Sequence, residues 1–126
     1  MSKTIIYTSA APEPIGPYSQ AVLSGNTLYV SGQIPINPSS GGLIEGNIKE
    51  ETDQVMKNLS AILEEAKMRF SDVVKCSIFV KNLSDFASIN AVYGKYFTTN
   101  PPARETVEVS RLPKGVNIEI SCIAIK

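Results

Sequence analysis

The chain has 126 residues, of which 43% are hydrophobic, and this fits a single domain over residues 1–126 with a modest core. Its 12 basic and 12 acidic residues cancel, which argues against a nucleic-acid partner, because such affinity depends mainly on neutralising phosphates. Histidine is absent and there are only 2 cysteines. The chain therefore has almost none of the residues that form a zinc site or a triad with a histidine base, and we expect no metal site.

The sequence offers no sign of a membrane or export segment. No apolar run approaches the roughly 20 residues that span a bilayer, and residues 1–11 lack the charged region and apolar run of a secretion signal. A cytoplasmic protein without membrane contact is the default expectation. Cys76 and Cys122 fall on the apolar faces of predicted strands, where free cysteines behave as small hydrophobes, so we expect free thiols rather than a disulfide.

The first third of the chain predicts short strands separated by turns. Strands are expected at residues 4–7, 20–23 and 27–31, with a tight turn at 24–26 between the last two and a loop at 35–42.

A helix of about five turns is predicted to follow. Asn47 with Glu50 three positions later resembles a capping box and opens it. The residues that recur at helical spacing and form one apolar stripe are Ile48, Val55, Met56, Leu59, Ile62, Leu63 and Ala66.

The second half predicts a strand at 73–80, a helix from about 85 to 97, and strands around Arg104 and at 117–125. The apolar face of the 73–80 strand holds Val74, Cys76, Ile78 and Val80, and the buried side of the helix holds Phe86, Ile89, Tyr93 and Phe97. The order β-β-β-α-β-α-β-β indicates an α+β fold, with a single mostly antiparallel mixed sheet covered by two helices on one face.

Two helices leave the second face of such a sheet uncovered. In the last strand, Ile123 and Ile125 share that face with Glu119 and Ser121. Burying this partly apolar surface by self-association is the natural solution, so the sequence predicts a homo-oligomer.

The strand around Arg104 is the most informative segment for chemistry. Alternation places Ala103, Val107 and Val109 on one face, available to a core, and Arg104, Thr106 and Glu108 on the other. An arginine with no carboxylate at the next position on its face suits a planar oxyanion such as a small carboxylic acid. The alternative is an exposed arginine paired with a surface acid, which would stabilise little.

Glu119 lies between Ile118 and Ile120 in a β-branched strand. Burial there would raise its pKa and suit it to shuttling protons; the alternative is an ordinary glutamate facing solvent. A simple hairpin would set Glu119 opposite Glu108, which is a destabilising pairing of like charges. The two strands are therefore expected to take different neighbours, and Arg104 need not approach Glu119 of its own chain.

Weaker candidates each carry a structural alternative. Asn90 shares a helical face with aromatic residues; its amide either ties down local backbone, which we favour, or faces a pocket. Tyr18 could aim its hydroxyl into a cleft or only pack. In Ser31-Gly32-Gln33, the glycine permits a ligand to approach the backbone closely, or marks a β-bulge.

These features coincide with a known pattern. The matching blocks are Ile15-Gly16-Pro17-Tyr18-Ser19-Gln20, Ser31-Gly32-Gln33-Ile34-Pro35, Phe86 to Tyr93 with Asn90, Pro102-Ala103-Arg104, and Val107-Glu108-Val109 with Arg111-Leu112-Pro113. Together and in this order they closely resemble the RidA (YjgF) family.

The resemblance implies a chorismate-mutase-like fold and a homotrimer with clefts between subunits. It implies hydrolysis of reactive 2-imino and enamine acids, such as 2-iminobutanoate and 2-iminopropanoate, to 2-oxo acids and ammonia without a cofactor. By matching motif position, Arg104 would clasp the substrate carboxylate with help from the Gly32 amide, and Glu119 would orient or activate water. Substrate-binding residues would be Tyr18, Ser31, Gly32, Asn90 and Thr106.

The chain also departs from the family pattern. Thr106 stands where many members carry cysteine, which we expect to tune the pocket, while Ser121 and Lys67 replace a common acidic residue and a common glycine. Two alternatives stay open: an RNA-cleaving translation inhibitor, and a non-catalytic ligand-binding or chaperone-like trimer.

Overall fold

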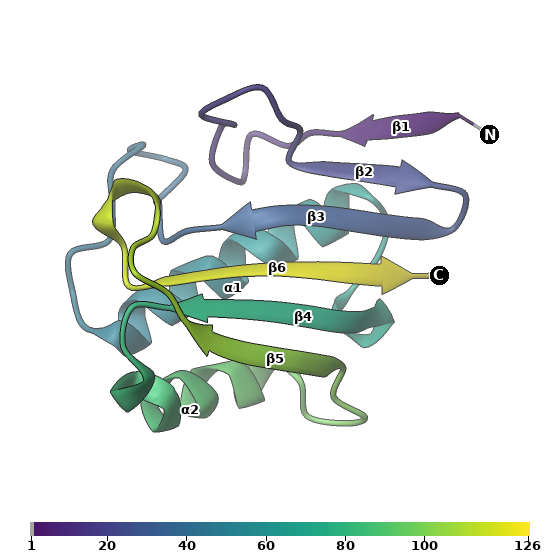
Figure 1. The fold of residues 1–126 in the computed structure, drawn as a ribbon. Helices are drawn as coiled ribbons and strands as arrows, with labels where there is room; N and C mark the ends of the chain where they lie inside the picture. Colours follow the sequence, from purple (N-terminus) through teal and green to yellow (C-terminus); the bar gives the residue numbers. More distant parts are fainter. Residues whose placement is uncertain (1) are drawn as a thin grey trace.

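The computed structural model describes residues 2–126, which form one mixed sheet with helices on one face (Figure 1). The strands are β1 Lys3–Ile6, β2 Ala21–Ser24, β3 Thr27–Gln33, β4 Val73–Val80, β5 Ala103–Glu108 and β6 Ile118–Ile125, in the order β1-β2-β3-β6-β4-β5. The helices are α1 Ile48–Glu65 and α2 Phe86–Tyr96, with 3-10 turns at Phe70–Asp72, Leu83–Asp85 and Pro113–Gly115. Only β4 and β5 pair in parallel among the described strands. The predicted fold class and element order are confirmed.

Helix α1 forms for the reasons that its sequence suggests. The Asn47 side chain accepts a hydrogen bond from the Glu50 backbone amide at 3.0 Å and so caps the first turn. The apolar stripe of α1 is at most 1% exposed at Val55, Met56, Leu59, Ile62 and Leu63. This stripe packs in the main core with the helix-facing residues of the sheet. In residues 2–126, no helix is both long and apolar enough to cross a bilayer.

Two residues predicted to be buried are exposed. Val74 is 45% exposed because the register between β4 and β6 shifts between Val73 and Lys75, which turns Val74 out of the apolar face. Phe86 is 43% exposed because it is the first residue of α2 and its ring lies against Arg104 of the edge strand β5 instead of in the main core. Cys76 and Cys122 are buried free thiols, as expected.

The faces of β5 differ from the prediction in one respect. Arg104 pairs with Cys76, so its side chain points to the side that the helices cover, and Thr106 beside Ile78 does the same. Ala103 and Val107 are exposed on the open side instead of entering the core. The prediction that these apolar residues are buried was wrong, because an edge strand has one sheet neighbour and the open face has no second layer in this chain.

Strand β4 lies between β5 and β6. The Arg104 and Glu119 strands therefore do not form a hairpin, which confirms that they take different neighbours. On β6, Ile118 and Ile120 are fully buried under the helices, so Glu119 points to the open face. That face also exposes Tyr29 and Ile125, while both helices lie on the other side of the sheet (Figure 1).

Candidate functional site

The seven residues singled out from the sequence fall into two groups. Tyr18, Ser31, Gly32 and Glu119 line one cleft on the open side of the sheet. Arg104, Asn90 and Thr106 lie between β5 and α2 on the helix side. One chain thus brings members of each group together but keeps the two groups apart.

The cleft is shaped by a bulge at the end of β3. Val30 pairs with Cys122 and Gln33 pairs with Ile120, so two residues of β3, Ser31 and Gly32, face a single residue of β6. A bulge of this kind re-aims side chains beside a site. The resulting cleft has a volume of about 330 Å³. Gly32 therefore lies in a β-bulge, as one prediction had it, and the bulge is also a place where another group approaches the backbone closely.

What approaches Gly32 is the Glu119 side chain. A Cβ atom at position 32 would lie 2.2 Å from Glu119 Oε2 and 2.7 Å from Glu119 Cδ, so only glycine leaves room for the carboxylate in this position. Burial raises the pKa of the Glu119 carboxyl above its ordinary value. A carboxyl with a raised pKa both accepts and returns a proton more readily near neutral pH, as a general acid–base group must.

The cleft walls are fixed by hydrogen bonds within the chain. Gln20 is 2% exposed; its amide nitrogen donates to the carbonyls of Thr8 at 3.0 Å and Pro12 at 2.9 Å, and its Oε1 accepts from the Thr8 amide. This pins the segment that carries Tyr18. The Ser31 hydroxyl donates to the Ser19 carbonyl at 2.6 Å, which orients Ser31 in the cleft.

Three apolar residues complete the lining: Ile15, Ile34 and Pro113. All three occur in the motif blocks of the sequence, yet they were not selected as site residues because an apolar side chain gives no chemical signal. Their proximity to Glu119 depends on the β3–β6 pairing, which brings distant segments together. They supply the low-polarity surroundings that keep the carboxyl desolvated.

The second group is centred on the Arg104 guanidinium. Its Nη2 donates to Asn90 Oδ1 at 2.6 Å, and its central carbon lies 4.8 Å from the Tyr93 ring centroid and 5.4 Å from that of Phe86. The ion pairs among the described residues do not include Arg104, so the alternative of a surface pair with an acid is wrong within one chain. A guanidinium held on rings without a counter-ion can receive an anion.

Asn90 and Thr106 stand beside this arginine. The favoured prediction for Asn90, a hydrogen bond to local backbone, was wrong, since its side-chain carbonyl oxygen accepts a hydrogen bond from Arg104 instead. Thr106 Oγ1 is buried and has no hydrogen-bond partner within residues 2–126. Because buried hydroxyls rarely stay unpaired, this atom is available to a ligand or a second chain.

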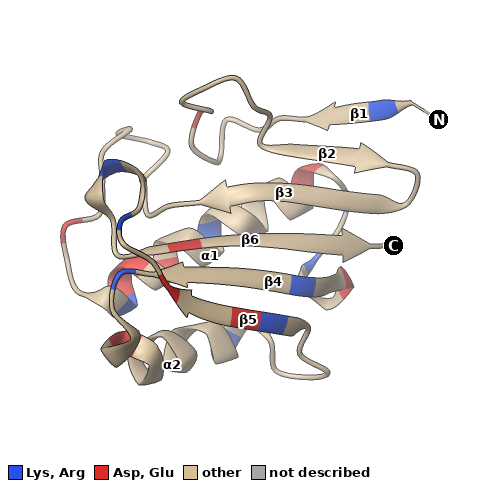
Figure 2. Cartoon of the chain, in the orientation of Figure 1, with Lys and Arg blue, Asp and Glu red and all other residues tan. Residues whose placement is uncertain are grey.

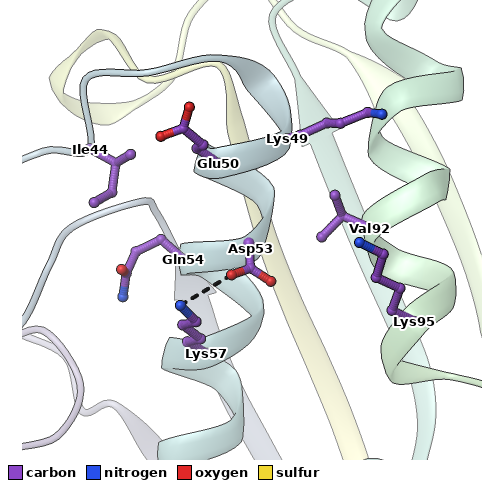
Figure 3. Close-up of a pocket in the computed structure, with 8 residues that line it drawn as sticks. All are labelled: Ile44, Lys49, Glu50, Asp53, Gln54, Lys57, Val92 and Lys95. Atoms are coloured by element: carbon purple, nitrogen blue, oxygen red, sulfur yellow. Dashed lines mark ion pairs between the residues drawn. The ribbon is translucent and has the colours of Figure 1, made fainter.

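Another hollow, of about 400 Å³, lies between α1 and α2 and contains none of the predicted site residues (Figure 3). Three lysines, Lys49, Lys57 and Lys95, line it together with the acidic Glu50 and Asp53. Asp53 is held by the Tyr96 hydroxyl at 2.5 Å and by Lys57 at 3.2 Å, and these contacts lower its pKa. The charges largely compensate one another, so we assign this hollow a structural role. Basic and acidic residues are interspersed over the described elements (Figure 2).

Comparison with known proteins identifies the family of this chain. Residues 8–126 match the family described as Endoribonuclease L-PSP. A RutC family protein of Pyrococcus abyssi is 54% identical over 100% of this chain and 99% of its own. The human 2-iminobutanoate/2-iminopropanoate deaminase is 46% identical over 98% of this chain and 90% of its own.

Solved structures give the same result. A Yersinia pestis protein of the conserved Rid family, whose function is described as unknown, superposes with a TM-score of 0.97 at 48% identity, covering 99% of this chain and 100% of its own. The chain belongs to the endoribonuclease L-PSP family, which includes the Rid proteins and the 2-iminobutanoate/2-iminopropanoate deaminases.

Proposed function

We propose that this protein hydrolyses 2-imino acids and their enamine forms, such as 2-iminobutanoate and 2-iminopropanoate, to 2-oxo acids and ammonia. The observation that carries the proposal is the Arg104 guanidinium, which has an amide and aromatic rings for neighbours but no carboxylate partner within the described chain. A substrate carboxylate supplies the missing anion. The human deaminase, 46% identical, supports the reaction type.

The chemistry requires little from the protein. The carbon of a protonated imine is already electrophilic, so positioning and one proton shuttle provide useful acceleration. Glu119 removes a proton from water as the water oxygen bonds to that carbon. Glu119 then gives the proton to the nitrogen. The carbon–nitrogen bond breaks, ammonia leaves, and the carbonyl of the 2-oxo acid forms with loss of the hydroxyl proton.

A complete site needs both groups of residues, and one chain holds them on opposite sides of its sheet. We therefore propose a homotrimer in which Arg104, Asn90 and Thr106 of one subunit face the Glu119 cleft of its neighbour. The open sheet face, with Tyr29 51% exposed and Ile125 43% exposed, supplies an apolar surface for such contacts. The other cleft residues, Tyr18, Ser31 and Gly32, would then line a shared pocket.

The test is direct. Freshly generated 2-iminobutanoate is added to the protein, and 2-oxobutanoate release is compared with the buffer rate. We expect acceleration by the wild type, loss of that acceleration in Arg104→Ala, and retention in Arg69→Ala, which removes an exposed arginine outside both groups. A wild-type rate equal to that of buffer would refute the proposed function.

RNA cleavage, which the family's description suggests, receives less support. The net charge is zero and the charges are interspersed (Figure 2), whereas RNA binding depends on concentrated basic residues. A salt titration of binding to single-stranded RNA separates the two functions, because only an RNA-binding protein shows affinity that falls steeply with salt.

A further inference from the structure

We propose that Tyr93 is a positioning residue of the carboxylate clamp: the face of its ring holds the Arg104 guanidinium in the orientation that receives the substrate. The inference rests on the proposed function and extends it to a residue that contacts the arginine instead of the substrate.

The geometry comes from one face of α2. Positions 86, 90 and 93 lie on the same side of a helix, and here they present an aromatic ring, an amide and a second aromatic ring to Arg104. Tyr93 provides the closer ring, at 4.8 Å from the guanidinium carbon against 5.4 Å for Phe86. It is also the better anchored, since Tyr93 is 6% exposed whereas Phe86 is 43% exposed.

The contacts around Tyr93 fix the plane of its ring. The ring packs 4.8 Å from that of Phe97, which in turn contacts Phe70 at 5.2 Å. A ring confined in this way offers the guanidinium a defined surface. Arginine otherwise has a flexible stem, and fixing that stem before the ligand arrives lowers the cost of binding.

The Tyr93 hydroxyl makes the residue easy to test. That oxygen is buried, and its one side-chain neighbour for hydrogen bonding in the described chain is the Cys76 thiol, a weak partner, so Tyr93→Phe keeps the ring face and loses at most a weak contact. Tyr93→Leu removes the ring face while retaining an apolar side chain. Phe70→Leu is the matched control, because it thins the same aromatic cluster at a residue outside the rings that contact Arg104.

The experiment measures kcat and KM for 2-iminobutanoate and, separately, the Kd for 2-oxobutanoate by calorimetry. We expect Tyr93→Leu to raise KM and Kd by roughly threefold to tenfold with little change in kcat, since the lost interaction aids binding in ground and transition states alike. Tyr93→Phe and Phe70→Leu should retain the wild-type KM. In an Arg104→Ala background, Tyr93→Leu should change Kd no further.

Three results overturn the inference, and each can be told from the others. If folded Tyr93→Leu keeps the wild-type KM and Kd while Arg104→Ala binds 2-oxobutanoate more weakly, Tyr93 only packs, and the proposed function stands. If Arg104→Ala itself leaves the Kd for 2-oxobutanoate unchanged, the arginine clamp is wrong and this inference fails with it, whereas the proposed function fails only if the wild type does not accelerate hydrolysis. Equal kcat losses in the Tyr93→Leu and Phe70→Leu variants without a KM change would also identify a merely structural role.

Discussion

Replacing Gly32 with alanine tests whether the position of the Glu119 carboxylate matters. The added Cβ would lie 2.2 Å from Glu119 Oε2, and ordinary van der Waals contact begins near 3.4 Å, so the oxygen must retreat by about 1 Å. The displaced atoms are the far end of a flexible side chain, so the fold should tolerate the change. A misplacement of about 1 Å can cost on the order of 100-fold in rate. We therefore expect Gly32→Ala to lower kcat for 2-iminobutanoate hydrolysis by about that factor.

Gly94→Ala is the matched control for this experiment. Gly94 lies in α2, and a Cβ there meets nothing within 4 Å, so the substitution should stabilise the helix by up to about 1 kcal/mol and leave kcat unchanged. Thermal unfolding of both variants separates a catalytic effect from misfolding. Combining Gly32→Ala with Glu119→Gln should add no further loss, since both act on one carboxylate. A folded Gly32→Ala protein with kcat within twofold of wild type would refute the reasoning.

Three further predictions concern stability. Burial raises the pKa of Glu119 in the folded protein, so its ionisation costs stability as pH rises through that folded pKa; urea unfolding should show Glu119→Gln more stable than wild type near about pH 8, with no difference below about pH 4. Gln20→Ala strips the partner from the Thr8 amide and should lower the free energy of unfolding by about 2 kcal/mol, measured by urea titration. Tyr96→Phe removes the hydroxyl that donates a hydrogen bond to Asp53 and should lower the free energy of unfolding by about 1 kcal/mol in the same assay. No loss would show that this contact between α1 and α2 does not stabilise the fold.

Much of the fold follows from local sequence signals. The Asn47 cap and the α1 stripe were predicted correctly because both depend on spacing along one helix. Val74 was misplaced because a register shift in β4 depends on the partner strand. The faces of β5 were assigned with the wrong burial because an edge strand follows the pairing of its neighbour rather than its own apolar pattern.

The candidate site was predictable in its charged members and not in its supports. Glu119 stood out as a charged residue between two isoleucines, and Arg104 as an arginine with no carboxylate at the next position on its face; both are local signals. The Tyr93 ring under Arg104 and the Ile34 and Pro113 walls became visible only with the tertiary contacts. Separation of the Arg104 and Glu119 strands was nevertheless predictable, since pairing Glu119 with Glu108 would have been repulsive, and β4 does lie between them.

Subunit mixing tests the central claim, that Arg104 of one subunit and Glu119 of its neighbour form one deaminase site. Arg104→Ala and Glu119→Gln proteins, each inactive alone, are unfolded together in equal amounts, refolded and assayed with 2-iminobutanoate. In random homotrimers, one shared site in four joins an intact arginine to an intact glutamate, so we expect about a quarter of the refolded wild-type activity. A mixture no more active than the separate variants, with refolded wild type active, would contradict the claim.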